Sequence, residues 1–297
     1  MAGGSAKSTV AIEGRELKLT NLEKVLYPAA GFTKGEVIDY YAHIAPILLP
    51  HLADRPLTVK RYPDGVGSSM FYMKNAPSYR PDWMRTARLP SPGSTKNRDM
   101  IDYLVVEDLP GLIWVANLAS LELHTPMWRV STGQPDLIVA DLDPGPPATI
   151  VDCCAVALLL REVIDGPLFA KTSGSKGMQV YGHAAKGATG EQTREDMRSV
   201  AERLAGEHPD LVVSNMRKSL RPGKVLIDWS QNNPAKTTVT AYSPRALEHP
   251  TVSTPVSWDE VEACRKPEDL VFTPADVLAR VERDGDLFAP LAGGSPA

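Results

Sequence analysis

Apolar side chains recur with helical spacing in several parts of the chain. The clearest case follows Thr33 and Glu36, a capping-box pair that marks the start of a helix. Its apolar positions, three or four residues apart, would form one buried face: Val37, Tyr40, Tyr41, Ile44 and Leu48. Further helices are expected at 111–120, 148–164 and 274–284, and from residue 189 onward. Another capping-box pair, Thr20 and Glu23, predicts a short turn that Pro28 stops.

Other segments have the residue types and the flanking turn residues of β-strands. We expect strands at 57–62 and 70–73, which would form a hairpin, at 121–124, 169–172 and 178–181, and over most of 225–242. Residues 88–98 are rich in Pro, Ser, Gly and basic side chains and predict a loop. Because strands and helices do not alternate regularly, the pattern favours an α+β fold with a mixed or antiparallel central sheet over a doubly wound parallel sheet.

Three aspartates stand where predicted strands end. Asp141 and Asp143 close one apolar run, and Asp228 closes another. Side chains two residues apart in a strand share a face and lie about 6.6 Å apart along it, near enough to share a pair of divalent cations. Carboxylate oxygens suit Mg²⁺ or Mn²⁺. If the two strands are neighbours, the carboxylates form a two-metal site; the alternative is ordinary turn chemistry before a Pro-Gly pair.

A glycine-rich turn at 173–177 lies between two predicted strands. Such a turn can direct backbone N–H groups and the ammonium of Lys176 at phosphate oxygens, although a plain hairpin turn accounts for the same residues. Arg221 and Arg245 flank the third aspartate in sequence, and guanidinium groups beside a metal–carboxylate cluster usually neutralise phosphate. The turn and the two arginines therefore predict a phosphate site, with the hairpin as the alternative.

Two aromatic residues and a histidine are candidates for contacts with a base. Phe71 and Tyr72, next to Lys74, offer a stacking plane, and core packing is the alternative for either ring. His124 ends a predicted strand and could donate to a nucleotide, whereas a lone strand histidine is more often structural.

Composition and charge narrow the classes of function. The 297 residues suffice for a full core, and a net charge of −4 argues against a basic coat for indiscriminate nucleic-acid binding. Local basic clusters at 55–74 and 217–224 remain candidates for a surface contact. No apolar stretch approaches the roughly 18 residues of a membrane span, and the three cysteines lack disulfide or zinc spacing. The expected location is the cytoplasm.

Taken in order, these segments resemble the polymerase domain of bacterial ATP-dependent ligase D, a branch of the archaeo-eukaryotic primase superfamily. The resemblance runs from about Leu19 to Leu287. It rests on an ordered set of motifs: NLEKVLYP (21–28), FYMK (71–74), LELH (121–124), DLDP (141–144), TSGSKG (172–177), KSLR (218–221), VLIDWSQN (225–232) and YSPR (242–245). Each motif alone is weak, whereas the set is highly specific.

The resemblance implies a role for each matched position. The three aspartates, Asp141, Asp143 and Asp228, would be the catalytic residues and hold two Mn²⁺ or Mg²⁺ ions. A second set would bind the nucleotide: Lys60, Phe71, Tyr72, His124, Ser173, Lys176, Gly177 and Arg245. Tyr72, where the family usually has phenylalanine, would stack on the incoming base. One departure is Gln179, at a position that is commonly histidine.

A third set would bind DNA. Lys24 and Lys34 match lysines that hold a downstream 5′-phosphate, and Arg221 lies in a loop that helps to position the primer and a metal. The alternative for both lysines is that they are merely solvated. Lys34 would be the first residue after a helix N-cap, where a cation is mildly unfavourable.

The fold and reaction implied by the resemblance are those of a primase-polymerase. Residues 10–290 would form one catalytic domain with an N-terminal α/β module, and 1–9 and 291–297 would be flexible tails. The reaction would add NTPs, and also dNTPs, to a primer 3′-OH on a DNA template, filling short gaps or processing ends in repair by non-homologous end joining.

The expected partners are gapped or broken duplex DNA with a downstream 5′-phosphate, the nucleotides, Ku and a separate ligase, with no membrane and a place at the nucleoid. The chain ends just after the family domain, which fits both an excised domain and a stand-alone actinobacterial polymerase.

Two other functions fit parts of the pattern. Glycosyltransferases also use an Asp-x-Asp motif with Mn²⁺, but they need no remote third aspartate. A non-catalytic module that binds DNA ends would keep the two lysines, and the intact acidic triad speaks against it.

Overall fold

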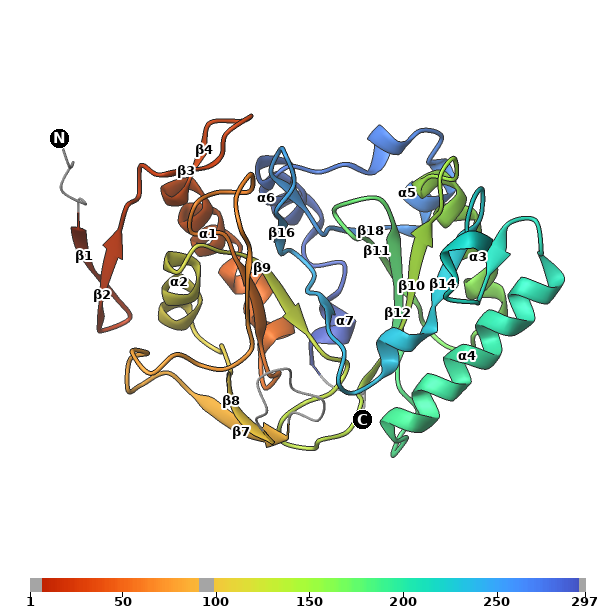
Figure 1. Cartoon of the computed structure of the whole chain (residues 1–297), viewed down its shortest axis with the longest axis horizontal. Coiled ribbons are helices and arrows are strands. Elements are labelled where there is room, and N and C mark those ends of the chain that lie inside the picture. Colours follow the sequence, from red (N-terminus) through yellow and green to blue (C-terminus); the bar gives the residue numbers. More distant parts are fainter. Residues whose placement is uncertain (1–6, 91–98, 294–297) are drawn as a thin grey trace.

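The computed structural model describes residues 7–90 and 99–293. Its elements are β1 (Lys7–Ile12), β2 (Arg15–Thr20), β3 (Val25–Tyr27), β4 (Phe32–Thr33), α1 (Lys34–Leu52), β5 (Thr58–Arg61), β6 (Phe71–Met73), β7 (Thr86–Pro90), β8 (Met100–Leu104), α2 (Leu109–Asn117), β9 (Ser120–Thr125), β10 (Leu137–Pro144), α3 (Ile150–Val163), β11 (Phe169–Thr172), β12 (Met178–His183), α4 (Gly190–Glu207), β13 (Val212–Val213), η1 (Lys218–Leu220), β14 (Val225–Asp228), η2 (Trp229–Asn232), β15 (Thr238–Val239), β16 (Pro244–Arg245), β17 (Thr251–Val252), β18 (Pro255–Val256), α5 (Trp258–Ala263), η3 (Pro267–Leu270), α6 (Pro274–Asp284) and α7 (Ala289–Ala292), where η marks a 3-10 helix. Figure 1 shows the N-terminal elements, coloured red to yellow, at one end of the molecule and α3 and α4 at the other.

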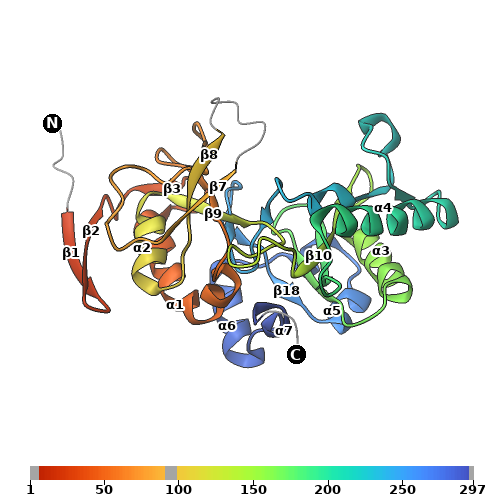
Figure 2. The ribbon, with the colours of Figure 1, turned by 90° about the horizontal axis from the view of Figure 1, so that it is seen from below.

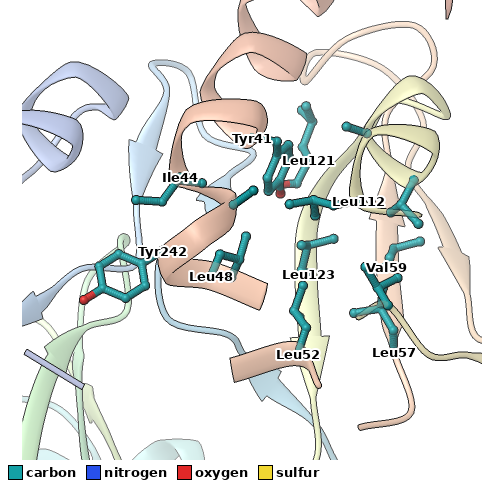
Figure 3. Packing of buried hydrophobic residues seen from close by; sticks show 14 of the residues in the cluster. Tyr41, Ile44, Leu48, Leu52, Leu57, Val59, Leu112, Leu121, Leu123 and Tyr242 are labelled. Carbon is teal, nitrogen blue, oxygen red and sulfur yellow. The ribbon is translucent and has the colours of Figure 1, made fainter. Parts of the chain in front are cut away.

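A four-stranded sheet with the order β15-β9-β5-β6 organises the N-terminal half. α1 packs on it through the apolar face that the sequence predicts, and Figure 3 shows Tyr41, Ile44 and Leu48 beside Leu121 and Leu123 of β9. All five side chains are fully buried, which stabilises the fold by about 1.5–3 kcal/mol for each side chain of this size. The Tyr41 hydroxyl keeps a partner in this core by donating to the Leu121 carbonyl at 3.0 Å.

The second sheet has six strands in the order β13-β14-β10-β12-β11-β18 and is antiparallel except for the β13–β14 pair. Its central strand β10 divides its side chains between two cores. Ala140 and Leu142 belong to the cluster formed with α3 and α4, whereas Val139 belongs to the cluster of the N-terminal half. Since side chains alternate along a strand, Asp141 and Asp143 share the face of Val139. A slip of one residue would bury both aspartates under the helices.

The two sheets therefore meet across the face that carries the aspartates. α3 and α4 cover the opposite face of the six-stranded sheet, on the outer side in Figure 1. The β1–β2 hairpin projects from the N-terminal end of the molecule. In Figure 2 the paired strands β7 and β8 lie along one long side of the molecule, and α6 and α7 lie along the other. Within the described residues no helix is long and apolar enough to cross a bilayer.

The structure confirms the α+β class and the mixed central sheet that carries the aspartates. The expected hairpin of β5 and β6 and the strand–turn–strand unit of β11 and β12 are present. α2 begins two residues earlier than expected because the Asp108 side chain accepts from the Gly111 N–H and caps the helix there. β1 starts at Lys7 and α7 ends at Ala292, so these elements extend into both segments expected as tails, and the domain limits remain a prediction.

Four local expectations were wrong in part. Thr20 ends β2, and the segment before Pro28 forms β3, because pairing with β1 and β4 outweighs the capping signal. Residues 88–90 lie in β7, and 91–98 lie outside the described residues. The expected extension over 225–242 is interrupted by η2. Arg55, expected in a surface cluster, is buried and paired with Asp136 at 2.6 and 2.8 Å.

Candidate active site

The three aspartates converge as the strand pattern predicts. β14 runs antiparallel beside β10, with Asp228 directly opposite Asp141 and Asp143 two residues further along β10. All three line one cavity of about 380 Å³, whose other walls come from the 173–177 turn, β9 and β15. Directly opposed side chains on neighbouring strands have Cβ atoms about 4.5–5.5 Å apart, so Asp141 and Asp228 share one small volume.

Each carboxylate is held by polar neighbours. Asp141 accepts from the Gln179 side-chain N–H at 2.9 Å, and Asp143 pairs with the Arg221 guanidinium at 3.2 Å. Asp228 accepts from the Ser230 N–H at 3.0 Å and the Gln231 side chain at 2.9 Å. Burial, and next the neighbouring Asp228, raise the pKa of Asp141 to about 6 against the hydrogen bond from Gln179. Added positive charge would favour its ionised form.

The donor set fits hard divalent cations. Three carboxylates meet at one cavity, and oxygen is the ligand atom that Mg²⁺ and Mn²⁺ prefer. Among the described residues, no three His, Cys, Asp or Glu side chains already form a compact cage for a metal. The contacts account for this, because Arg221 holds an oxygen of Asp143 and Gln231 holds one of Asp228. Arg221, in the segment after η1, contacts only Oδ2 of Asp143, so the other oxygen of that carboxylate stays available to a cation.

The turn between β11 and β12 faces the aspartates across the cavity. The Ser173 hydroxyl accepts from the N–H groups of Ser175 and Gly177 at 3.3 and 3.2 Å, so its own proton remains to be donated. Lys176 is exposed at the cavity and, within the described residues, has no carboxylate within 4 Å. The turn thus supplies a hydroxyl and an unpaired ammonium to an anionic ligand.

Glycine is required at two positions of this turn. Gly174 has a φ of +68°, and a Cβ there would lie 2.7 Å from both the Arg245 Cγ and the Ser253 backbone nitrogen. A Cβ on Gly177 would lie 2.1 Å from the Leu142 carbonyl oxygen. Close packing of the turn on Arg245 and on β10 therefore fixes its distance from the aspartates.

Glu122, a residue that sequence reasoning missed, organises the opposite wall. Its buried carboxylate contacts Lys60 Nζ at 2.8 Å, His124 Nε2 at 2.8 Å and Arg245 Nε at 3.3 Å, and it accepts from the Ala246 N–H at 3.2 Å. Burial alone would raise the pKa of Glu122, but the bond from His124 and the charge of Arg245 outweigh it and hold that pKa well below its ordinary range. Three residues expected to bind the nucleotide are thus joined through one anion.

The aromatic pair is divided by the pleat of β6. Tyr72 lies opposite Lys60 in the β5–β6 register, lines the cavity and is 56% exposed, with the Lys60 Nζ 5.7 Å from its ring centre. Phe71 is 54% exposed and does not line that cavity. Both rings are outside the core, so core packing, the alternative for either, does not apply.

The two lysines expected to bind DNA lie away from the cavity and near each other. Lys24 is half-exposed and pairs with Asp64 at 2.7 Å. Lys34 is 4% exposed, and its Nζ donates to the Thr20 carbonyl, the Thr20 hydroxyl and Asn117 at 2.6, 3.2 and 2.8 Å. The alternative that Lys34 is merely solvated is therefore wrong. Burial, then the charges of Lys24 and Arg61, lower the pKa of Lys34 to about 8.

Sequence reasoning also missed several polar residues around the aspartates: Lys171, Thr238, Gln231 and Lys236. Gln231 belongs to the matched VLIDWSQN motif, and its position three residues after Asp228 was an available signal. Lys171 gave none, because a lysine inside a strand predicts a solvent-facing side chain, whereas this one is 1% exposed.

Comparison with known proteins places this geometry in a known context. Residues 33–288 match the family model described as "LigD, primase-polymerase domain". The chain is 42% identical over 286 residues to the multifunctional non-homologous end joining protein LigD of Mycolicibacterium smegmatis, covering 94% of this chain and 36% of the relative. It is 32% identical over 277 residues to the bifunctional non-homologous end joining protein LigD of Bacillus subtilis, covering 92% of this chain and 44% of the relative.

One solved structure is similar over nearly the whole fold. It is the polymerase domain of Mycobacterium tuberculosis ligase D in complex with DNA, with 37% sequence identity and a TM-score of 0.86. The match covers 94% of this chain and 99% of that one. The chain thus has the length of the solved polymerase domain, and it spans less than half the length of the curated relatives it matches.

Proposed function

Since this chain belongs to the LigD primase-polymerase family, whose polymerase domains are metal-dependent nucleotidyltransferases, we propose that it adds nucleotides to a primer 3′-OH on gapped or broken DNA. The observation that carries the proposal is the register that sets Asp228 opposite Asp141, with Asp143 on the same face and a cationic turn across the cavity. Family membership decides against the glycosyltransferase alternative, and the intact triad speaks against a non-catalytic module.

Asp141, Asp143 and Asp228 would hold two ions, Mn²⁺ or Mg²⁺. When bound, such ions lower the pKa of an attacking hydroxyl and neutralise triphosphate charge. The side chains themselves contribute orientation, because Asp141 and Asp228 sit on paired strands of a packed sheet and can move little. Release of Asp143 by Arg221 would free a ligand for the metal and a guanidinium for a phosphate in one motion.

The nucleotide would lie between the two sheets. Ser173 and Lys176 would bind the triphosphate from one side, with Gly177 allowing the close approach of the turn to β10. From the other side Arg245 and Lys60, both held by Glu122, would face the same phosphates, and His124 would lie close to the sugar. Tyr72 would stack on the incoming base, with its ring over Lys60, and Phe71 would meet a neighbouring base.

A downstream 5′-phosphate would be held at a second site formed by Lys24, Lys34 and Arg61. Lys34 is buried, and within 7–90 and 99–293 its ammonium has only neutral acceptors, so its charge is uncompensated and its field favours an anion nearby. Lys24 would provide the direct contact by exchanging Asp64 for the phosphate. Since the chain is acidic overall, a few placed cations must supply the affinity for DNA.

We assign the reaction to the filling of short gaps and the processing of ends in non-homologous end joining, at the nucleoid and alongside Ku and a ligase. The names of the relatives support this pathway, and the DNA in the related solved structure supports the substrate. Ribonucleotides are expected to serve at least as well as deoxynucleotides, because a contact from a polar side chain of the cavity, such as Gln231, to the ribose 2′-OH would favour them.

Extension of gapped duplexes tests the proposal. Wild-type protein should extend the primer across a short gap in the presence of Mn²⁺, and a 5′-phosphate on the downstream strand should tighten DNA binding. Lys24→Ala should remove that tightening while extension of an ordinary primer–template persists. Equal affinity of the wild type for gaps with and without the 5′-phosphate would refute the proposed 5′-phosphate site. Absence of any extension would refute the proposed activity.

A further inference from the structure

Lys171 is a buried lysine without a carboxylate partner among the described residues, and burial holds the pKa of its amine well below its ordinary range. It lies in β11 with 1% of its surface exposed, and among the described residues no Asp or Glu oxygen lies within 4 Å of its Nζ. Its partners are neutral: it donates to the Gln179 side-chain oxygen at 2.6 Å and the Ser253 hydroxyl at 2.6 Å. A buried lysine of this kind is costly, so its presence in the sheet calls for a reason beyond packing.

The strand register gives that reason. Lys171 lies opposite Gln179, Gln179 opposite Asp141, and Asp141 opposite Asp228, so four side chains form one row across β11, β12, β10 and β14. Opposed residues of antiparallel strands share a face, which makes the row continuous on the cavity side of the sheet. The contacts follow the row, from Lys171 to the Gln179 oxygen and from the Gln179 N–H to Asp141 at 2.9 Å.

The lysine fixes the orientation of the Gln179 amide. An amide has one accepting and one donating end, and the Asp141 carboxylate can only accept. With the oxygen held by Lys171, the N–H group must face Asp141. The reverse orientation would set the amide oxygen against the Asp141 carboxylate and would lose the bonds that this oxygen accepts from Lys171 at 2.6 Å and from the Tyr181 hydroxyl at 3.4 Å.

This arrangement suits a carboxylate that must bind metal. A neutral N–H group satisfies one lone pair of Asp141 and leaves the others free, whereas a cation in direct contact would compete with the metal, as Arg221 does at Asp143. We propose that Lys171 and Gln179 are positioning residues that hold Asp141 ready for a divalent cation. The inference rests on the proposed metal site and assigns to Gln179 a task in metal binding.

The contacts that run from Lys171 through Gln179 to Asp141 are called the relay below. Binding of Mn²⁺ to the whole chain without nucleotide or DNA tests it. Free Mn²⁺ is measured by electron paramagnetic resonance for the wild type, Asp141→Ala, Lys171→Met, Gln179→Leu and the Lys171→Met/Gln179→Leu double variant. Outer partners of metal ligands typically contribute about 10- to 100-fold in affinity, so each single relay variant should weaken Mn²⁺ binding by about that factor. Because Lys171 acts through Gln179, the double variant should bind within about threefold of the weaker single variant.

Ser253→Ala is the matched control. It removes the other partner of Lys171, which links β11 to the segment between β17 and β18, and leaves the contact with Gln179 intact. Its Mn²⁺ affinity should stay within about threefold of the wild type, although its melting temperature falls. If it loses as much affinity as Lys171→Met, Lys171 serves the fold and the relay is overturned.

Two further outcomes are decisive. Unchanged Mn²⁺ affinity in Gln179→Leu overturns the relay, even if Lys171→Met does not fold, because that variant removes the only N–H donor of Asp141 among the described contacts. If the wild type shows no Mn²⁺ binding that Asp141→Ala abolishes, the proposed metal site itself is refuted, and the relay with it. Wild-type binding with unchanged relay variants refutes the relay alone.

Discussion

Replacement of Glu122 by glutamine should affect nucleotide binding and stability together. The carboxylate uses both oxygens: Oε2 contacts Lys60 and His124, and Oε1 contacts Arg245 and the Ala246 N–H. An amide has only one oxygen. With the amide nitrogen at the Oε2 position the contact with Lys60 is lost, and with it at the Oε1 position the contacts with Arg245 and the Ala246 N–H are lost, so one of the two cations loses its partner in either orientation.

The magnitude follows from burial and charge. Glu122 is 3% exposed, and removing one partner of a buried ion pair typically costs about 3–5 kcal/mol because the remaining charge is left without a partner. We therefore expect Glu122→Gln to lower the melting temperature by about 10 °C. Either Lys60 or Arg245 then loses its carboxylate partner, and a hydrogen bond to a charged group contributes about 1.5–3 kcal/mol, so the KM for the nucleotide should rise about 10- to 100-fold.

The assay compares steady-state nucleotide incorporation and thermal unfolding for Glu122→Gln and for Asp136→Asn. Asp136 is a matched control because its carboxylate also joins two cations, Arg55 and Arg129, but lies outside the cavity. Asp136→Asn should lower the melting temperature without raising the nucleotide KM. A Glu122→Gln variant that is destabilised yet keeps the wild-type KM would refute the link between this carboxylate and the nucleotide.

The pH dependence supplies a second check. The pKa of Glu122 is held below its ordinary value of 4.5, because the bond from His124 and the charge of Arg245 outweigh burial. A depressed carboxyl pKa stabilises the fold above the unfolded-state pKa and loses that effect as the pH falls toward the folded-state pKa. The difference in unfolding free energy between wild type and Glu122→Gln should thus be constant above about pH 5 and shrink below about pH 4.5. A difference that grows as the pH falls would contradict this assignment.

Three further predictions concern separate parts of the site. Gly174→Ala should raise the nucleotide KM at least about tenfold, because the added Cβ pushes the turn away from Arg245. Gly187→Ala is the control: its φ is also positive, at +77°, but no atom lies within 4 Å of its Cβ, so this change should lower only stability. Equal KM values for the two variants would contradict the packing argument. Preference for a 5′-phosphate should weaken as the pH rises through about 8, because Lys34 then loses its charge, and a pH-independent preference from 7 to 9 would argue against it. On one gapped template NTPs should be incorporated at least as fast as dNTPs, and a strong deoxynucleotide preference would count against the assigned pocket.

The aspartate cluster was largely predictable because its signal is local. Two residues at a spacing of two on one strand must share a face, and Asp228 ends a similar apolar run. The register that sets Asp228 opposite Asp141 was not predictable, because it depends on the pairing of strands 87 residues apart in the chain. The same limit applies to the relay through Lys171, whose burial follows from its place in an inner strand.

Other features were hidden because their partners come from distant segments. Glu122 lies in the matched LELH motif, but the cations that it joins come from β5 and β16, so the sequence around it does not show which partners it has. Lys34 follows an N-cap, which suggests an exposed position, yet Asn117 and Thr20 enclose its ammonium. At Thr20 a capping signal was present, and strand pairing with β1 prevailed over it. Tertiary contacts, rather than local preference, decided each of these cases.

Single-turnover extension of a gapped duplex in Mn²⁺, for the wild type, Asp141→Ala and Asp228→Ala, tests the central claim most directly. Loss of one carboxylate removes a metal ligand, so each variant should be slower by at least about three orders of magnitude, with the fold retained by circular dichroism. Asp136→Asn, outside the cavity, controls for the general cost of removing a carboxylate. Folded Asp141→Ala or Asp228→Ala protein that extends the primer within tenfold of the wild-type rate would contradict the assignment of this cluster as the catalytic metal site.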